Sequence, residues 1–380
     1  MSRTQSARLQ PDLTLLPGAL FAPVVPAVRI WLFAVAGLCF AIAVVGAVTR
    51  LTESGLSMVE WKPLTQDIPP LSHDDWLRVF GLYQQSPQYR LVNAGMSLSE
   101  FQGIFWWEWT HRLIAQLIGI AFAVPFAWFL VRRQLPRRLV PYLAGLFLLG
   151  GMQGLLGWAM VASGLVDRPS VSHYRLAAHL SLDLTIYALT LWTAFFVSRP
   201  RAELAVPAPL QPALRKHATI GLAVLATTMI WGAFTAGLRG GLLYNSFPLM
   251  GGSIAPPDLL SMHPWWTNFV ENPGSVQFVH RLLAMIAGLT LLGLALRLRA
   301  PSIAPELRRL ATGLFAVVAL QILLGIETVL HQVPVWLGAL HQANAILLLG
   351  LVVRTLFLLR APATPQFHPR LVVTNRKAEG

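Results

Sequence analysis

The chain has 380 residues, of which 55% are hydrophobic and only 12% are charged. Soluble domains carry about 25% charged residues, so this composition excludes an ordinary soluble protein and indicates a membrane protein. The formal net charge of +13 does not indicate nucleic-acid binding, because the basic residues are concentrated in a few short loops. The single cysteine, Cys39, lies in an apolar run, which excludes an intramolecular disulfide and a thiolate metal site.

Eight apolar segments are long enough to cross a bilayer, which takes about 20 helical residues. They are Ile30–Thr49, Ile104–Val131, Leu139–Ala162, Leu176–Val197, Ile220–Leu238, Val276–Leu296, Leu310–Leu330 and Val335–Leu358. Basic residues gather in the loops on one side of these segments and acidic residues on the other, so both chain ends are expected in the cytoplasm (N-in/C-in). The sequence therefore predicts an all-α polytopic membrane protein with a cytoplasmic arm, residues 1–27, and a cytoplasmic tail, residues 361–380.

Two outer loops, residues 50–103 and 239–275, are long and rich in Trp, Pro and Gly. Tryptophan is typical of the membrane–water interface. We expect short interfacial helices that cap the outer side, for instance His73–Gln84, rather than a separate soluble domain.

An internal repeat covers most of the chain. GAVTRLTESGLS before the first outer loop resembles GAFTAGLRGGLL before the second, and EWTHRLIAQLIG matches QFVHRLLAMIAG. MQGLLGW and RLAAHLS have their counterparts in LQILLGI and LGALHQA. The sequence thus predicts two four-helix units of the same orientation, residues 28–200 and 217–360, joined by a cytoplasmic linker, residues 201–216. A parallel repeat, and the absence of an acid in mid-membrane, argue against an inverted-repeat transporter.

Four of the ten histidines occupy matched positions of the repeat: His111, His179, His280 and His341. Each lies in the first turns of an even-numbered segment, so all four are expected at similar depth, two in each unit. Two imidazoles on facing helices satisfy a six-coordinate haem iron, whereas zinc or copper needs further ligands. The alternative is that each histidine only bonds a neighbouring hydroxyl or carbonyl group. Small residues nearby are expected to leave room for a macrocycle, although they also serve helix packing: Gly119, Ala177, Ala178, Gly338 and Ala339.

Arginines accompany these histidines. Arg112 and Arg281 follow them in both copies, and Arg175 precedes His179 by one helical turn. Guanidinium groups match carboxylates, so we expect these three to bind haem propionates. The alternative is that these arginines only extend their charged groups to the membrane interface. For Arg50 and Arg239, at the mouths of the outer loops, this alternative has the same weight as propionate binding. His173 and His331, before the fourth and eighth segments, are expected in loops and mainly solvated.

The two copies differ at one chemical group. Glu108 lies one turn before His111, and the neutral Gln277 takes its place in the second copy. A carboxylate beside a haem edge can move protons and stabilise positive charge. The alternative is an ion pair with Arg112 or Arg50 that only maintains geometry. The interpretation assigns chemistry to the first unit and electron transfer or structure to the second.

Several motifs carry a family resemblance: TRLTESGLSMVEWKPLTQDIPP, EFQGIFWWEWTHRL, AGLRGGLLYNSFPLMGG, ENPGSVQFVHRLLA and LGALHQANA. Together they resemble haem A synthase, a membrane enzyme that oxidises the C8 methyl of haem O to the formyl group of haem A. The resemblance implies haem b on His280 and His341, the substrate haem on His111 and His179, and an essential acid at Glu108. The first outer loop lacks the cysteine pair of one family branch, so the chain is similar to the alphaproteobacterial and mitochondrial branch.

The resemblance also implies a bacterial inner-membrane location, haem O delivery by a haem O synthase, and an electron-transfer partner. Two successive hydroxylations of the methyl would give a gem-diol that loses water to the aldehyde. Either one histidine of the first unit leaves the iron in turnover, or oxygen does not bind at that iron. A di-haem b electron-transfer protein is the alternative function, and a homo-oligomer stays open.

Overall fold

The computed structural model describes residues 25–60, 68–164, 170–198 and 206–360. Its long helices are α1 Pro26–Leu51, α4 Leu98–Val131, α5 Val140–Gly164, α6 His173–Ser198, α7 Gln211–Gly237, α8 Pro273–Arg297, α9 Pro305–Leu330 and α10 Val335–Leu358. Each of these eight is long and apolar enough to cross a membrane, which confirms the all-α polytopic class. The N-in/C-in orientation stays a prediction, and the arm and the tail fall almost wholly outside the described residues.

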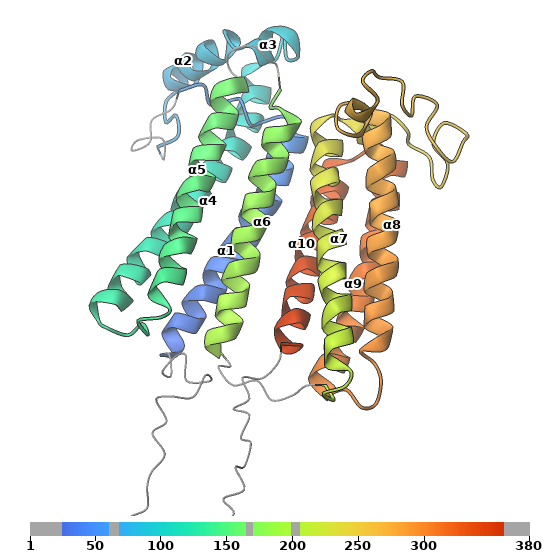
Figure 1. Ribbon diagram of the computed structural model, residues 1–380. Helices are drawn as coiled ribbons and strands as arrows, with labels where there is room; N and C mark the ends of the chain where they lie inside the picture. The colour runs from blue at the N-terminus through green and yellow to red at the C-terminus, as the bar shows by residue number, and fades with distance from the viewer. Residues whose placement is uncertain (1–24, 61–67, 165–169, 199–205, 361–380) are drawn as a thin grey trace, which may run out of the picture.

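The helices lie in two groups of four (Figure 1). We call α1, α4, α5 and α6 the first unit, and α7, α8, α9 and α10 the second unit. Helices α1 and α6 contact α10, and α6 also contacts α7, so these four helices form the interface between the units. Helix α1 begins, and α10 ends, at the same lower side of the molecule (Figure 1). Chain ends on the same side are what an even number of spans gives, and the parallel repeat stays a prediction.

Proline or a capping side chain starts most long helices. Pro26, Pro212, Pro273 and Pro305 occupy the first positions of α1, α7, α8 and α9, where the missing N–H has no helical partner to lose. Helix α4 begins at Leu98, earlier than the predicted Ile104. A capping box between Ser97 and Glu100 explains the earlier start, because it bonds backbone N–H groups that the helix leaves free.

Short helices cover the outer end of each unit. In the first loop these are α2 His73–Gln84 and α3 Pro87–Leu91, and in the second the 3₁₀ turns η2 Gly240–Leu242 and η3 Trp265–Phe269. The predicted interfacial helix His73–Gln84 is confirmed. An aromatic cluster that includes Phe80, Tyr83 and Phe101 packs α2 on the outer extension of α4.

One apolar core, shared by both units, fills the half of the bundle away from the outer loops. It contains Leu32 and Val35 of α1, Leu294 of α8 and Val352 of α10, all nearly inaccessible. The four repeat-matched histidines lie on the outer side of this core. The inner half of the bundle is therefore mainly a packed support for the outer half, where the four histidines lie.

The first unit is the looser of the two. In the apolar windows of α4 and α5 only 11% and 6% of residues are buried, against 28% and 17% for α8 and α9 at the same places of the repeat. Side chains explain part of this difference. In the second unit, Ile322 of α9 lies 3.4 Å from the position of a Cβ on Gly288. The repeat equivalents of Gly288 and Ile322 in the first unit are Gly119 and Gly154. A Cβ on either of these two glycines would meet nothing within 4 Å.

Candidate active site

Each repeat-matched histidine packs against a glycine of a neighbouring helix. A Cβ on Gly46, Gly157, Gly232 or Gly325 would lie 3.0, 3.1, 3.0 or 3.1 Å from Cε1 of His111, His179, His280 or His341, respectively. Carbon atoms pack best at about 3.5–4.0 Å, so any larger residue would push the imidazole away. The sequence analysis did not assign these glycines a role. They stand at equal places in GAVT and GAFT, and in LLGW and LLGI, which is the signal that identifies them.

Each unit holds two of the histidines. Helices α4 and α6 carry His111 and His179, and helices α8 and α10 carry His280 and His341. The histidines thus lie on the helices that the repeat predicts, and their pairing on one iron stays a prediction.

The Nδ1 atoms of these imidazoles differ between the units. His280 Nδ1 lies 3.1 Å from the carbonyl O of Thr228, and His341 Nδ1 lies 3.1 Å from Nε2 of Gln321. Nδ1 of His111 and Nδ1 of His179 are buried and have no hydrogen-bond partner among the described residues. The Nδ1 atoms of the second pair therefore have protein contacts that the Nδ1 atoms of the first pair lack.

Glu108 is 2% exposed and is surrounded by donors. Its Oε2 accepts hydrogen bonds from Ser57 Oγ at 2.7 Å and from the Met58 backbone N–H at 2.8 Å. Its Oε1 forms an ion pair with Arg112, whose Nη2 also donates to the Met58 carbonyl O at 3.1 Å. Both the loop after α1 and the carboxylate are held in place by this network. Of the two ion-pair partners considered from the sequence, Arg112 is present, whereas Arg50 bonds the carbonyl groups of Ala236 and Gly237.

The second unit holds its loop with the corresponding residues. Gln277 Nε2 and Arg281 Nη2 donate to the carbonyl O of Tyr244 at 3.1 and 2.8 Å, and Tyr244 is the repeat equivalent of Met58. The Tyr244 hydroxyl donates to Asp258 at 2.5 Å, and this hydrogen bond, with a smaller effect of burial, raises the pKa of Tyr244 to about 12. This hydrogen bond joins two parts of the outer loop, and Gln277 and Arg281 attach the loop to α8.

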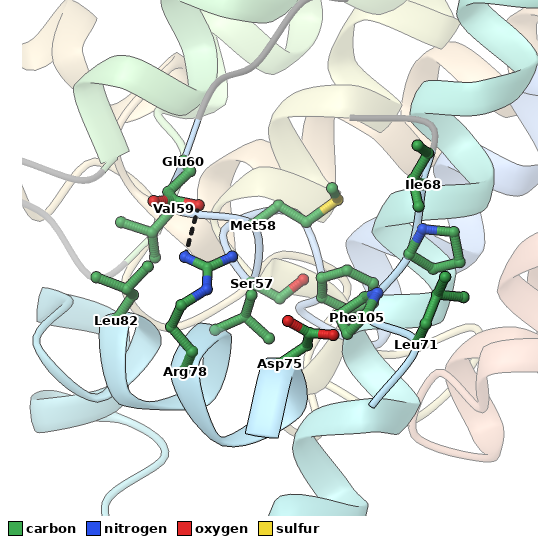
Figure 2. A pocket seen from close by; sticks show the side chains of 13 residues that line it. Ser57, Met58, Val59, Glu60, Ile68, Leu71, Asp75, Arg78, Leu82 and Phe105 are labelled. Carbon is green, nitrogen blue, oxygen red and sulfur yellow. Dashed lines mark hydrogen bonds and ion pairs between the residues drawn. The ribbon is translucent and has the colours of Figure 1, made fainter. Parts of the chain in front are cut away.

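A cavity of about 260 Å³ opens on the outer side of the Glu108 network (Figure 2). Ser57 and Met58 line it together with Phe105 of α4, and Asp75 and Arg78 of α2 lie at its polar side (Figure 2). The backbone that bonds Glu108 is thus also a wall of this cavity, so the outer loop connects the acid to the surface of the first unit.

Arg112 keeps a free donor. Its side chain is 16% exposed, and Nη1 is buried without a hydrogen-bond partner among the described residues. Arg281 instead uses Nη1 and Nη2 on the carbonyl groups of Ser246 and Tyr244. Arg175 donates to the Ala159 carbonyl O at 3.3 Å. Of the three arginines expected to bind propionates, Arg112 therefore has the clearest unused capacity.

A charge pair crosses from one unit to the other at the outer mouth. Arg239 forms an ion pair with Glu53, and both residues have a positive φ, 54° and 56°. These two residues are themselves equivalent positions of the repeat. Snorkelling to the interface therefore does not describe Arg239, which connects the two units.

Three expectations need correction, those for His173, Gly338 and Asp183. His173 is not in a solvated loop: it is buried at the start of α6, with Nε2 3.7 Å from Glu271 Oε2. His331, by contrast, is exposed as expected, and its Nδ1 lies 3.3 Å from Glu327 Oε2. Gly338 leaves no room for a macrocycle, because a Cβ there would lie 2.7 Å from Leu51 Cδ1.

The third correction concerns Asp183, because the sequence analysis counted no acid in mid-membrane. Asp183 is 9% exposed in α6, one helical turn after His179, and no described residue forms a hydrogen bond with it. Ala345 stands at this place in the second unit. The signal was available in the sequence, since an ionisable residue inside an apolar segment is a functional candidate by default.

Comparisons with known proteins identify the family of this chain. The family model of the cytochrome oxidase assembly protein COX15-CtaA matches residues 29–353. The heme A synthase of Rhodospirillum centenum is 51% identical over 343 residues, 90% of each chain. Those of Nitrosospira multiformis and Parvibaculum lavamentivorans are both 48% identical, over 84% and 86% of this chain and 90% and 92% of their own. The chain belongs to the COX15-CtaA family of cytochrome oxidase assembly proteins.

Proposed function

We propose that the chain is a haem A synthase that oxidises the C8 methyl of haem O to the formyl group of haem A in the first unit. The second unit holds haem b on His280 and His341. One observation carries the assignment: two matched histidine pairs lie against glycines, and only the first pair has carboxyl groups one turn away, Glu108 beside His111 and Asp183 beside His179. Family membership and the names of the relatives support it.

The residues present fit a porphyrin in each unit. The two histidines of each unit would hold the haem iron through their imidazoles. In the second unit Nδ1 of His280 faces a carbonyl group, an arrangement that leaves Nε2 free for a metal. In the first unit, two buried Nδ1 atoms and Arg112 Nη1 lack partners among the described residues, so donors remain for a substrate that is not permanently bound.

The substrate undergoes two hydroxylations at one methyl carbon, and each replaces a C–H bond by a C–OH bond. If water supplies the oxygen, each step releases two electrons and two protons; if dioxygen supplies it, each step takes up two electrons and two protons and the second oxygen atom leaves as water. The resulting gem-diol loses water to give the aldehyde. Haem iron in the second unit would supply one-electron transfer to or from a partner protein. Glu108 accepts or returns the proton: Oε2 has two donors and Oε1 only Arg112 among the described residues, which leaves Oε1 an acceptor site. Arg112 orients a carboxylate of the substrate through its free Nη1.

The open space in the first unit supports its assignment to the substrate. Haem O has a long isoprenoid tail and must enter and leave, and Gly119 and Gly154 leave the gap between α4 and α5 unfilled. In the second unit Ile322 occupies the corresponding gap. The enzyme lies in the bacterial inner membrane and takes haem O from a haem O synthase.

A di-haem b electron-transfer protein is the competing function. Purified protein is extracted with acid acetone, and the porphyrins are separated by chromatography. We expect haem b together with haem O or haem A. Two equivalents of haem b and no other porphyrin would support the competing function.

The role of Glu108 is tested with Glu108→Gln, which takes the residue of the second unit. The amide retains an acceptor for Ser57 and Met58 but lacks the charge. We expect the variant to keep haem b and to accumulate haem O. The matched control is Gln277→Glu, which places a carboxylate near the second pair and should leave haem A formation intact. Haem A formation at the wild-type rate in Glu108→Gln would remove Glu108 from the reaction.

A further inference from the structure

The second histidine pair has a supporting side chain that the first pair lacks. We propose that Asn344 is a positioning residue of the second unit: acting through Gln321, it fixes the imidazole of His341 and keeps haem b bound. The inference rests on the proposed haem b site and adds the reason why one site retains its porphyrin while the other exchanges it.

Asn344 determines how the Gln321 amide is turned. Asn344 is 7% exposed in α10, one turn after His341. Its Nδ2 donates to the Val317 carbonyl O at 3.0 Å and to Gln321 Oε1 at 2.7 Å. A carbonyl group can only accept, so Val317 fixes the Asn344 amide, and Asn344 in turn makes the Gln321 oxygen face it.

Gln321 therefore presents its nitrogen to His341. Nε2 lies 3.2 Å from the His341 carbonyl O, and 3.1 and 3.3 Å from the two ring nitrogens. A Cβ on Gly325, one turn further along α9, would lie 3.1 Å from Cε1 of the same ring. The amide of Gln321 and the backbone of α9 at Gly325 thus both contact the imidazole.

The first unit has the same glutamine without its support. Gln153 Nε2 lies 3.1 Å from the His179 carbonyl O and 3.3 Å from His179 Nε2. Leu182 stands where Asn344 stands in the second unit, and Gln153 Oε1 is buried with no partner among the described residues. The Gln153 amide is therefore held on one side only, and the His179 ring with it.

The difference matches the two roles. An outer-sphere contact that fixes an imidazole typically changes metal affinity about 10- to 100-fold when it is removed. A resident cofactor benefits from such a contact, whereas a substrate porphyrin must be released after each turnover. A leucine in place of Asn344 would make the second site resemble the first.

The test uses the full-length detergent-purified protein and the reciprocal variants Asn344→Leu and Leu182→Asn. Haem loss is followed as transfer to apomyoglobin, and the haem b signal is recorded by electron paramagnetic resonance, which reports the orientation of axial imidazoles. We expect Asn344→Leu to lose haem b about 10-fold faster or more with a shifted resonance. We expect Leu182→Asn to retain haem O or haem A longer without changing haem b.

A double variant separates positioning from packing. If Asn344 acts through Gln321, then Gln321→Leu with Asn344→Leu loses haem b no faster than Gln321→Leu alone. Additive effects would overturn the relay, as would wild-type haem loss and resonance in Asn344→Leu. If Asn344→Leu does not fold, Asn344→Ala is measured instead, and Leu182→Asn decides independently.

The outcomes also separate this inference from the proposed function. Wild-type protein without haem b, or full haem b in a His280→Ala, His341→Ala variant, would refute the cofactor site itself. Haem b bound by these histidines, with loss unaffected by residue 344, would refute only the positioning role.

Discussion

Gly232→Ala is predicted to weaken haem binding in the second unit without weakening the fold. The new Cβ would lie 3.0 Å from Cε1 and 3.5 Å from Nδ1 of His280. Carbon contacts are optimal at about 3.5–4.0 Å, so the ring must move by about 0.5 Å. That movement also strains the 3.1 Å contact of Nδ1 with the Thr228 carbonyl O.

The magnitude follows from two opposing effects. Overpacking costs about 1–3 kcal/mol, and because it acts on the iron ligand it corresponds to a roughly 5- to 150-fold weaker haem affinity. Replacing a helical glycine with alanine favours the helix by about 1 kcal/mol. We therefore expect thermal stability of the haem-free protein to be unchanged or higher while haem b is lost.

The assay is the haem b content of purified protein, measured as its pyridine haemochrome, followed by transfer to apomyoglobin. Gly37→Ala is the matched control, because a Cβ on Gly37 of α1 would meet nothing within 4 Å. Equal haem content and equal transfer rates for wild type, Gly232→Ala and Gly37→Ala would refute the close-contact argument.

Three other changes test separate parts of the molecule. Gly154→Ile copies Ile322 into the gap beside α4; the ratio of haem O plus haem A to haem b should fall, and an unchanged ratio would contradict a substrate gap there. Arg239→Ala breaks the partly exposed pair with Glu53, and because such pairs contribute about 0–1 kcal/mol the melting temperature should change by only a few degrees. Asp183→Ala removes a buried carboxyl group without a described partner. Because burying an unpaired polar group costs about 1–3 kcal/mol, the variant should have a higher thermal stability. A loss of haem A formation in a stable variant would instead give Asp183 a role in the reaction.

The helices and the histidine pairs were accessible from the sequence because both leave periodic signals. Apolar length marks the spans, and α2 has the predicted bounds His73–Gln84. Pairing within a unit follows from the repeat, since His111 and His280 stand in the same motif. Because the sequence is duplicated, the spans and the histidine positions could each be assigned twice, once in each unit.

The contacts of Glu108 were not accessible in the same way. Ser57 and Met58 lie in a loop some fifty residues earlier in the chain, and no helical period relates them to Glu108. The expectation for Gly338 was wrong for a similar reason. A small residue near a histidine indicates space only if no other helix fills that space, and Leu51 of α1 fills the space beside Gly338. Local sequence predicts the type of a side chain but not which distant residue packs on it.

A comparison of Glu108 with Gln277 of the second unit favours one of the two interpretations of Glu108. The ion pair with Arg112 does hold the outer loop, because both groups bond Met58. Yet Gln277 and Arg281 hold the equivalent Tyr244 by donating to its carbonyl O, a neutral acceptor. Loop attachment therefore does not require a carboxylate. Burying one has a desolvation cost that the second unit avoids. This difference supports the proposal that the charge at Glu108 serves the reaction of the first unit, through proton exchange with the substrate.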